Sequence, residues 1–356
     1  MTSNPHSKRN SSPPHGRNYD QAPLVVTWEI TQACDLACDH CRATADPERD
    51  PAELDRTAAI DLFEQVASFE PTPFFVFTGG DPLKRPDVFE LLSEARDAGV
   101  TPAITPATTP LLDRAAIEDF VDAGVGRMAL SLDGATAQSH DAFRGEPGTF
   151  DRAMKAAEDA RDLGLSIQFN TTVTARTVDE LPTIADIVTA YDAAMWEVFF
   201  LVPVGRGTEL TQLSPDRARK VTKWLYRHSQ EVPYRVITVE APFYRRAARE
   251  VQLERGERSN RVGSTGAGDG FVFVSHTGEV YPSGFLPISV GNIRETPLGE
   301  LYREAPLMRR LRDHDELTGT CGRCEFSPEC GGSRSRALAA TGDPFGTDPL
   351  CPWSSA

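Results

Sequence analysis

Short apolar runs alternate with helical patterns from residue 24 to about residue 232, and this rhythm limits the possible folds more than any other feature. Several runs, such as LVVTWEI at 24–30 and FFVF at 74–77, are almost continuously apolar, as expected for parallel strands buried on both faces. Further strands are predicted at 101–104, 127–132, 167–173 and 196–202. Helices are predicted at 55–69, 86–98, 113–123, 149–163, 178–191 and 215–230.

Six such strand–helix units predict an α/β fold with a parallel sheet over residues 23–235, either open or curled into a partial barrel. In folds of this kind, the working groups lie where the strands end, on loops at the carboxyl edge of the sheet. Candidate functional residues are therefore expected directly after the predicted strands.

The segments on either side of the rhythm have a different composition. Residues 1–22 are rich in Ser, Pro, Asn and Arg, and we expect a disordered tail. The rhythm is expected to end near residue 232. The segment 236–270, which includes the Gly-rich run RGERSNRVGSTGAGDG, is expected to be a linker or bridging region.

The last part of the chain, residues 271–356, is expected to form a small cysteine-rich domain. FVFVSHTGEVYP at 271–282 predicts a β-hairpin with His276 as a turn residue, and a helix is predicted over 298–312. The final 36 residues are too few to form an apolar core alone, so a metal or cross-links are expected there.

The charge balance excludes some classes of function. With 37 Lys and Arg against 52 Asp and Glu, the net charge is −15, and such a chain repels a nucleic-acid backbone. No stretch reaches the roughly 18 uninterrupted apolar residues of a membrane span. The polar N-terminus has no apolar signal segment, which predicts a cytoplasmic protein. Clustered cysteines in that compartment indicate metal binding or catalysis rather than disulfides.

Cys34, Cys38 and Cys41 form a CxxxCxxC pattern in the loop after the first predicted strand. Three thiolates are one too few to close a tetrahedral zinc site or a four-iron cluster. A four-iron cluster held by three cysteines keeps one iron free for an outside molecule. The alternative is a zinc ion with nearby His40 as its fourth ligand.

Glycines and polar residues mark the ends of other predicted strands. They are Gly79, Gly80, Asp81, Ser131, Asp133, Asn170 and Thr172. With the cysteine pattern, they make residues 24 to about 235 resemble the radical S-adenosylmethionine (SAM) enzymes, although Asp81 replaces the Glu of that family's Gly-Gly-Glu-Pro motif. The resemblance implies a partial (β/α)6 barrel.

The resemblance also implies roles for these residues. Cys34, Cys38 and Cys41 would hold a catalytic 4Fe–4S cluster, and His40 would lie beside the adenine of SAM. The residues Gly79, Gly80 and Asp81 would hold the methionine amino group, while Ser131, Asp133, Asn170 and Thr172 would contact the cofactor. The family cleaves SAM to a 5′-deoxyadenosyl radical, which abstracts hydrogen from an unactivated C–H bond. The protein orients the reactants and excludes water.

A second cysteine group, CxxCx5C followed by a late cysteine, lies near the C-terminus. It consists of Cys321, Cys324, Cys330 and Cys351. Four thiolates complete the ligand set of either a structural zinc ion or a 4Fe–4S cluster. The pattern, with GEVYP and GNI, resembles the SPASM auxiliary-cluster domain of radical SAM enzymes over about residues 270–356.

The second group departs from the full SPASM pattern. Ser283 and Ser333 stand where further cluster cysteines are common. The resemblance therefore implies one auxiliary 4Fe–4S cluster, and two clusters in the whole chain. A fully ligated cluster offers no iron to substrate, so its expected task is electron transfer.

Four segments resemble the iron-coproporphyrin decarboxylases of the alternative haem pathway: SLDGATAQSHDAFRG, NTTVT, FFLVPVGRG and GFVFVSHTGEVYP. That resemblance implies a tetrapyrrole whose propionate loses hydrogen and CO2 to leave a vinyl group. Two electrons leave for each vinyl group: one reduces SAM, and the other needs an acceptor. Phe243 stands where this group tends to have a histidine.

Substrate carboxylates would favour arginine partners, because the guanidinium fork matches a carboxylate. Arg144 and Arg206 are the first candidates, followed by Arg334 and Arg336. Tyr244 is a candidate to cap a metal or donate a hydrogen bond. For each of these residues the alternative is a surface charge, a structural ion pair or simple packing.

Two other functions stay open. Many SPASM-type enzymes modify ribosomally made peptides, although here only about 22 residues precede the predicted barrel rather than a peptide-recognition domain. An iron–sulfur electron carrier or redox sensor would have the cysteines but would need no SAM motif. As an enzyme of this family, the chain would take electrons from a ferredoxin or flavodoxin-type donor.

Overall fold

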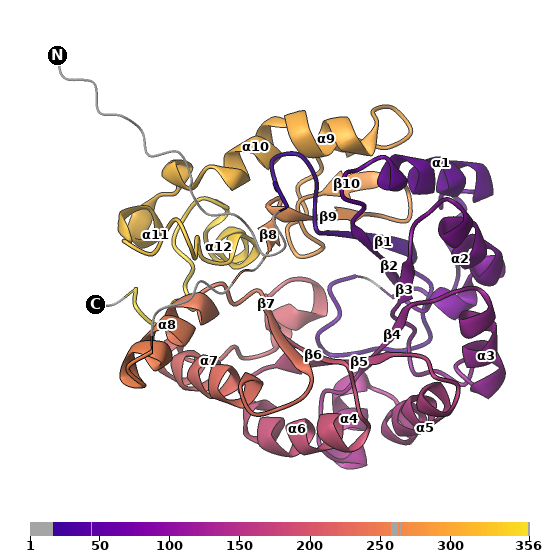
Figure 1. Cartoon of the computed structure of the whole chain (residues 1–356), viewed down its shortest axis with the longest axis horizontal. Coiled ribbons are helices and arrows are strands. Elements are labelled where there is room, and N and C mark those ends of the chain that lie inside the picture. Colours follow the sequence, from indigo (N-terminus) through magenta and orange to yellow (C-terminus); the bar gives the residue numbers. More distant parts are fainter. Residues whose placement is uncertain (1–16, 44, 258–262, 264, 355–356) are drawn as a thin grey trace.

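The computed structural model describes residues 17–43, 45–257, 263 and 265–354. In this part of the chain, parallel strands follow one another around an arc whose outer side is covered by helices (Figure 1). They are β1 (Val25–Thr31), β2 (Phe74–Gly79), β3 (Pro102–Ile104), β4 (Arg127–Ser131), β5 (Ile167–Val173), β6 (Met195–Phe200) and β7 (Arg235–Val239). The predicted α/β class, the partial barrel and all six predicted strands are confirmed.

The helices on the outer side return the chain from one strand to the next. They are α1 (Arg56–Ala67), α2 (Val88–Asp97), α3 (Arg114–Asp122), α4 (Ala137–Arg144), α5 (Thr149–Asp162), α6 (Leu181–Ala190), α7 (Pro215–Ser229) and α8 (Tyr244–Glu254). Side chains of Asp55, Asp113 and Ser214 cap the first turns of α1, α3 and α7 by accepting backbone NH groups. The six predicted helices are confirmed, and α4 and α8 are additional ones.

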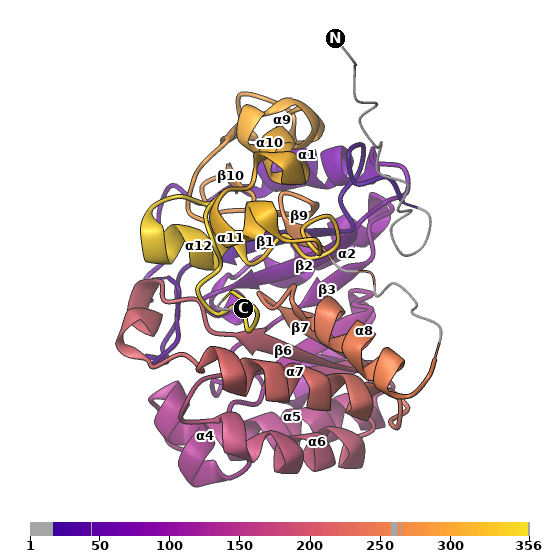
Figure 2. The same ribbon diagram turned by 90° about the vertical axis from the view of Figure 1, so that its left-hand side faces the viewer.

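The prediction that the rhythm ends near residue 232 is wrong. A seventh parallel strand, β7, pairs with β6, and α8 packs beside α7 (Figure 2). The expected linker over 236–270 therefore contains most of β7 and all of α8. The reason is that α8, YRRAAREVQLE, places three arginines among its apolar positions, and β7 is a short, partly exposed edge strand.

The C-terminal part extends the barrel sheet rather than forming a separate one. Its elements are β8 (Gly266–Ala267), β9 (Gly270–Val274), β10 (Glu279–Tyr281), β11 (Gly291–Asn292), α9 (Leu298–Glu304), α10 (Pro306–Arg312), α11 (Gly319–Arg323) and α12 (Arg334–Thr341). The strand β9 pairs in parallel with β1, and β10 pairs antiparallel with β9, which confirms the hairpin. The predicted single helix over 298–312 is wrong: Ala305 is extended before Pro306, which starts a second helix.

The predicted tail is partly wrong as well. Residues 1–16 lie outside the described residues, but 17–22 pack onto the barrel. The buried guanidinium of Arg17 donates to the carbonyl oxygens of Pro23, Pro71 and Thr72. The hydroxyl of Tyr302 donates to the carbonyl of Tyr19 at 2.7 Å. Residues 17–22 are therefore part of the folded structure, and their polar composition does not reveal the contacts that hold them.

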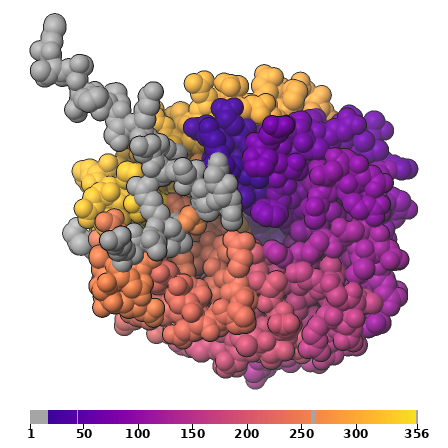
Figure 3. Space-filling view, viewed as in Figure 1, coloured from indigo at the N-terminus to yellow at the C-terminus, as the bar shows by residue number. Residues whose placement is uncertain are grey.

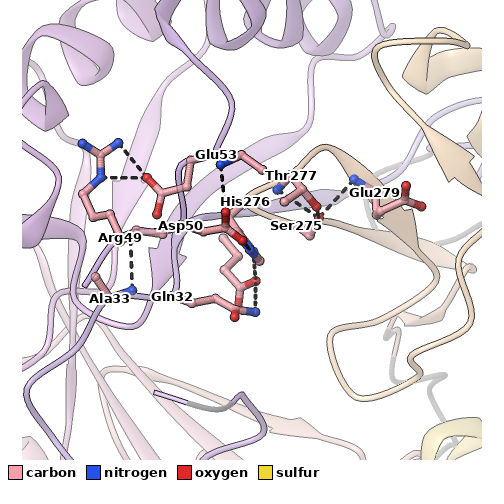
Figure 4. Close-up of polar contacts among 12 residues, drawn as sticks. Gln32, Ala33, Arg49, Asp50, Glu53, Ser275, His276, Thr277 and Glu279 are labelled. Atoms are coloured by element: carbon pink, nitrogen blue, oxygen red, sulfur yellow. Dashed lines mark hydrogen bonds and ion pairs between the residues drawn. The ribbon is translucent and has the colours of Figure 1, made fainter. Parts of the chain in front are cut away.

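The hairpin is fixed to the barrel through His276 (Figure 4). Its Nδ1 lies 3.1 Å from Oε2 of Glu29 in β1, and its Nε2 lies 3.4 Å from Oδ2 of Asp50. The backbone NH of Leu54 donates to the His276 carbonyl at 2.7 Å. His276 is thus the expected turn residue, and it also joins the two halves of the sheet.

The C-terminal segment spans the side of the barrel between β7 and β9. The buried Arg336 of α12 pairs with the carboxylate of Asp348, with both oxygens at 3.0 Å, and donates to the carbonyls of Leu201 and Glu240. These contacts tie α12 to the ends of β6 and β7. Among the described residues, no helix is long and apolar enough to cross a membrane.

Candidate active site and cluster sites

The first cysteine group lies on one loop at the carboxyl end of β1. Cys34, Cys38 and Cys41 pack together with buried Leu36 and Ala107. The backbone NH of Leu36 donates to Sγ of Cys34 at 3.4 Å. The structure therefore brings the three predicted cluster ligands together at the edge of the sheet where catalytic loops are expected.

The loop after β2 supports the cysteine loop from one side. The NH of Gly80 donates to the carbonyl of Thr31 at 2.8 Å, and the NH of Asp81 donates to that of Ala33 at 2.7 Å. A Cβ at residue 80 would lie 2.4 Å from the Ala33 oxygen, so only glycine fits. The glycines were predicted to hold the methionine amino group of SAM, and that contact stays a prediction. In the structure, Gly80 makes room for the backbone of the cysteine loop.

The loop after β6 supports the cysteine loop from another side. The backbone NH of Arg206 donates to the carbonyl of Cys41 at 2.9 Å, and its Nε donates to that of Cys38 at 2.8 Å. Gly205 has φ +54°, and a Cβ there would lie 2.5 Å from the Cys41 oxygen. Arg206, a predicted substrate residue, thus holds the cysteine loop. Its Nη2 is buried without a hydrogen-bond partner among the described residues.

Asp133 and Arg144 form a buried ion pair next to the cysteines, with Nη1 and Oδ2 3.3 Å apart. Burial alone would raise the pKa of Asp133, but nearby His40, Arg144 and the NH of Thr172 bring it below its usual value. Burial likewise disfavours the charge on Arg144, yet the adjacent Cys38 and Asp133 hold its pKa above normal. Arg144, another predicted substrate residue, is therefore a buried cation beside the cysteine loop.

His40 stacks on Phe143, with ring centroids 4.8 Å apart and planes 15° apart. The guanidinium of Arg176 also lies over the ring of Phe143, 5.0 Å from the ring centroid. Burial lowers the pKa of His40 to about 4, so its ring is neutral at physiological pH. Its Nδ1 has no hydrogen-bond partner among the described residues. A flat neutral ring thus lies beside the cysteine loop, where the adenine contact was predicted.

Asp81 is fully buried, and its carboxylate accepts hydrogen bonds from the hydroxyl of Thr109 at 2.7 Å and the NH of Leu83 at 3.2 Å. Burial raises the pKa of Asp81. In the described chain, this carboxylate therefore stabilises its own turn. Its predicted contact with the methionine amino group stays a prediction.

The remaining predicted cofactor residues lie on adjacent strands. Ser131 of β4 stands opposite Asn170 of β5, and the NH of Thr172 donates to Oδ1 of Asp133 at 2.7 Å. Their neighbours Leu130 and Phe169 are fully buried in the core under the helices. Because strand residues alternate between faces, the half-buried polar row faces the barrel interior.

The sequence analysis missed Glu197 in this row. It lies opposite Asn170, on β6, and accepts a hydrogen bond from Nε2 of Gln168 at 3.0 Å. Burial raises the pKa of Glu197 to about 7. A single charged residue within the apolar run WEVFFLV was the available signal.

Glu240 was also missed, because the strand that carries it was not predicted. It follows β7 with φ +56°, a backbone conformation that is uncommon for glutamate. Its carboxylate accepts hydrogen bonds from the hydroxyls of Ser283, Ser333 and Ser335. The two serines that replace SPASM cysteines therefore bind this carboxylate.

The second cysteine group lines a single cavity. Cys321, Cys324, Cys330 and Cys351 all border it, together with Phe243 and Trp353 among others. Sγ of Cys321 accepts hydrogen bonds from Nη2 of Arg334 and the NH of Asp348, both at 3.5 Å. No three His, Cys, Asp or Glu side chains of the described residues meet around one metal-ion position.

The remaining substrate candidates have structural contacts. Arg334 donates to the carbonyls of Pro344 and Gly346, and Arg336 forms the buried pair with Asp348. Tyr244 is buried between α7 and α8, with its ring edge-on to that of Tyr226. Each of these side chains therefore makes the ion pair, hydrogen bonds or packing contacts that were the alternative to a substrate contact.

Both cysteine groups have surroundings that fit an iron–sulfur cluster. Burial raises the pKa of Cys34 and Cys351 to about 11 and that of Cys330 to about 12, so these thiols become ligands only when a metal replaces their protons. NH donors to sulfur, as at Cys34 and Cys321, stabilise ligand thiolates. Among the described residues, the buried Nδ1 of His40 and Nη2 of Arg206 have no hydrogen-bond partner, which leaves polar atoms for a further molecule at the three-cysteine loop.

Comparisons with known proteins agree with this geometry. The Radical SAM superfamily model matches residues 28–188, and an iron-sulfur cluster-binding domain (SPASM) matches residues 266–325. The AdoMet-dependent heme synthase of Methanosarcina barkeri is 38% identical over 339 residues, 93% of this chain and 96% of that protein. The mycofactocin maturase MftC of Mycobacterium tuberculosis is 30% identical over 93% of this chain and 83% of that protein.

Among solved structures, Streptococcus suis SuiB bound to S-adenosylmethionine resembles this fold, with a TM-score of 0.72 and 17% identity over 93% of this chain and 77% of that one. The chain therefore belongs to the radical SAM family, with a SPASM iron–sulfur domain after its barrel, and its cofactors are S-adenosylmethionine and two 4Fe–4S clusters.

Proposed function

We propose that this enzyme acts in haem biosynthesis by oxidative decarboxylation of the propionate side chains of an iron porphyrin. The observation that carries the proposal is the 38% identity to an AdoMet-dependent heme synthase along nearly the whole of both chains. Such a reaction needs one open site and one fully ligated site. The three-cysteine group fits the first need and the four-cysteine group fits the second.

The three-cysteine loop is the proposed catalytic centre. When bound there, the cluster and SAM supply a radical that can remove hydrogen from an unactivated C–H bond. The chain's own residues position these reactants. Arg206 and Gly80 fix the backbone of the cysteine loop, and the Arg144–Asp133 pair places a buried cation beside the thiolates. The ring of His40 is the proposed adenine contact, and the row Ser131, Asn170 and Thr172 the proposed contact with the rest of SAM.

Each decarboxylation must dispose of one hydrogen atom and one electron. Loss of hydrogen from the propionate, followed by release of CO2, leaves a vinyl group and one electron. The four-cysteine site is the proposed acceptor of that electron, since its ligand set is complete and offers no position to substrate. A ferredoxin or flavodoxin-type protein is the proposed source of the electron that starts each cycle.

Arg206 and Arg144 both stay proposed candidates for a substrate carboxylate, because Nη2 of Arg206 and Nε of Arg144 are buried without a hydrogen-bond partner among the described residues. Tyr244 packs against Tyr226, and we propose a positioning role for it. The half-buried Glu197, with its pKa raised to about 7, is a further proposed contact on the barrel interior.

The test uses anaerobically reconstituted holoenzyme with dithionite, SAM and iron-coproporphyrin III. Formation of 5′-deoxyadenosine and the porphyrin mass are followed together. Loss of two CO2 with two matching equivalents of 5′-deoxyadenosine supports the proposal. Formation of 5′-deoxyadenosine with an unchanged porphyrin contradicts the substrate but retains the radical chemistry.

A second candidate function is modification of a ribosomally made peptide. The observation that favours it is the 30% identity to a mycofactocin maturase over 93% of this chain. The two candidates are separated by the same assay, with a precursor peptide in place of the porphyrin. A mass change in the peptide and none in the porphyrin would select the second.

A further inference from the structure

The helical hairpin α7–α8 has a charge opposite to that of the rest of the molecule. Its two helices carry eight Lys and Arg against three Asp and Glu, a net charge of +5, whereas the whole chain has −15. A basic region on an acidic protein attracts acidic partners. The hairpin is therefore the region to examine for a protein partner.

One edge of this hairpin packs arginines onto two aromatic rings of the C-terminal segment. The guanidinium of Arg246 lies 4.4 Å from the centroid of the Phe326 ring and 4.6 Å from that of Trp353. Arg249 lies 5.3 Å from Phe326, and Arg219 of α7 lies 5.2 Å from Trp353. We call these five residues the arginine–aromatic face. The yellow C-terminal segment lies against the orange α8 in Figure 3.

The same rings border the four-cysteine site. Trp353 lines the cavity that the four cysteines share, and Phe326 lies in the sequence between Cys324 and Cys330. Phe326 also lines a shallow surface hollow with Arg246, Arg249 and Leu253. Trp353 therefore borders the cysteine cavity and also belongs to the arginine–aromatic face.

The arginine–aromatic face retains charge and apolar area for a partner. Arg249 is exposed and has no ion pair among the described residues, and Leu253 beside it is 61% exposed. Of the two carboxylates in the hollow, Glu250 is already paired with Arg219 and Lys223, both at 2.9 Å. Glu325 is the other. An exposed apolar residue with an unpaired cation beside it is typical of a surface for a transient protein complex.

We propose that the arginine–aromatic face is the docking surface for an acidic one-electron carrier protein, which collects the electron that each turnover leaves at the four-cysteine site. The step transfers one electron and no atoms: the cluster held by the four cysteines is oxidised, and the carrier is reduced by one electron. The inference rests on the proposed function only for the origin of that electron. The docking itself depends on charge and shape.

The test measures binding of a plant-type 2Fe–2S ferredoxin, an acidic carrier, to the anaerobic holoenzyme by isothermal titration calorimetry. Arg249→Glu should weaken binding about 10-fold or more, since it replaces attraction with repulsion at an interface charge. Arg161→Glu is the matched control, because Arg161 is an exposed arginine on α5, away from the hairpin. Raised salt should weaken binding of the wild type more than that of Arg249→Glu.

Equal dissociation constants for the two variants, or no measurable binding of the ferredoxin, would overturn the proposal. An equal loss of affinity for a basic carrier such as a cytochrome c in Arg249→Glu would do the same. The iron content of Arg249→Glu and its formation of 5′-deoxyadenosine with dithionite should match the wild type, because Arg249 contacts neither cysteine group. If the porphyrin is not a substrate but Arg249→Glu still weakens binding, the docking surface stands and the proposed function falls.

Discussion

The two cysteine groups of this protein differ in how the chain surrounds them. The three-cysteine loop is held through its backbone, by Gly80 and Arg206 on neighbouring loops. In the part of the chain that the structure describes, one nitrogen each of His40 and Arg206 has no hydrogen-bond partner there. The four-cysteine cavity has a fourth cysteine that completes its ligand set, and the buried Arg336–Asp348 pair supports it. One arrangement leaves room for a molecule to bind, whereas the other fits an electron-transfer centre.

Removal of one cysteine from each group should separate their tasks most strongly. We expect Cys38→Ala to abolish SAM cleavage, because two thiolates cannot hold the cluster. Cys324→Ser should retain SAM cleavage by dithionite-reduced enzyme but lose product, since the electron left on the substrate has no acceptor. Quantification of 5′-deoxyadenosine and product in parallel checks both. Loss of SAM cleavage in Cys324→Ser, with the first cluster still present, would argue against separate tasks.

The anchor of the four-cysteine site gives the next largest effect. Arg336→Ala leaves Asp348 buried without its partner, which should cost about 3–5 kcal/mol of stability. The measurements are the midpoint of thermal unfolding and the iron content. Arg336→Met with Asp348→Leu should recover part of the loss, because it removes both buried charges. A double variant as unstable as the single one would show that the hydrogen bonds to Leu201 and Glu240 dominate.

The support of the three-cysteine loop should have a moderate effect. Arg206→Ala removes the hydrogen bond to the Cys38 carbonyl and should lower cluster retention or SAM cleavage about 10-fold, as is typical for groups that orient metal ligands. Lys84→Ala is the matched control, since its exposed pair with Asp35 on the same loop is worth little. Similar losses in the two variants would indicate that the loop is held by charge rather than by the Arg206 contact.

The smallest expected effect is a change of stability with pH at His276, which joins the C-terminal hairpin to the barrel. The hydrogen bond to Glu29 raises the pKa of His276 above its ordinary value of about 6.5. A raised pKa in the folded state means that this contribution is complete below about pH 6.5 and is lost as the pH rises through the folded value. Stability in the wild type should therefore fall as the pH rises above about 6.5, as measured by thermal unfolding.

His276→Gln should flatten that part of the pH profile, because glutamine keeps a hydrogen-bond donor without a titratable charge. Glu29, Asp50 and Arg42 are the charged groups around His276, and all three remain in this variant. An unchanged slope in His276→Gln would assign the pH dependence to other groups.

The sequence predicted the regular part of the fold because the relevant signals are local. Buried parallel strands such as FFVF are apolar throughout, and the cysteine spacing marks the loop after β1. The strand β7 and helix α8 were missed for the opposite reason. Edge exposure makes β7 less apolar, and α8 contains the arginines that face Phe326 and Trp353.

Side-chain partners were harder to predict than side-chain types. Arg144, Arg206 and Arg336 were chosen as cations that could meet a carboxylate. Only the fold determines that the first pairs with Asp133, the second holds Cys38, and the third pairs with Asp348. Likewise, Ser283 and Ser333 marked replaced cysteines, but their shared partner Glu240 lies on an unpredicted strand.

The most direct test of the account is electron paramagnetic resonance of the dithionite-reduced protein, with and without SAM. Two variants isolate the sites: Cys321→Ala with Cys324→Ala keeps the three-cysteine loop, and Cys34→Ala with Cys38→Ala keeps the four-cysteine cavity. We predict that SAM changes the 4Fe–4S signal of the first variant and leaves that of the second unchanged. A SAM-dependent change in the second variant, or none in the first, would contradict the assignment of one open and one closed site.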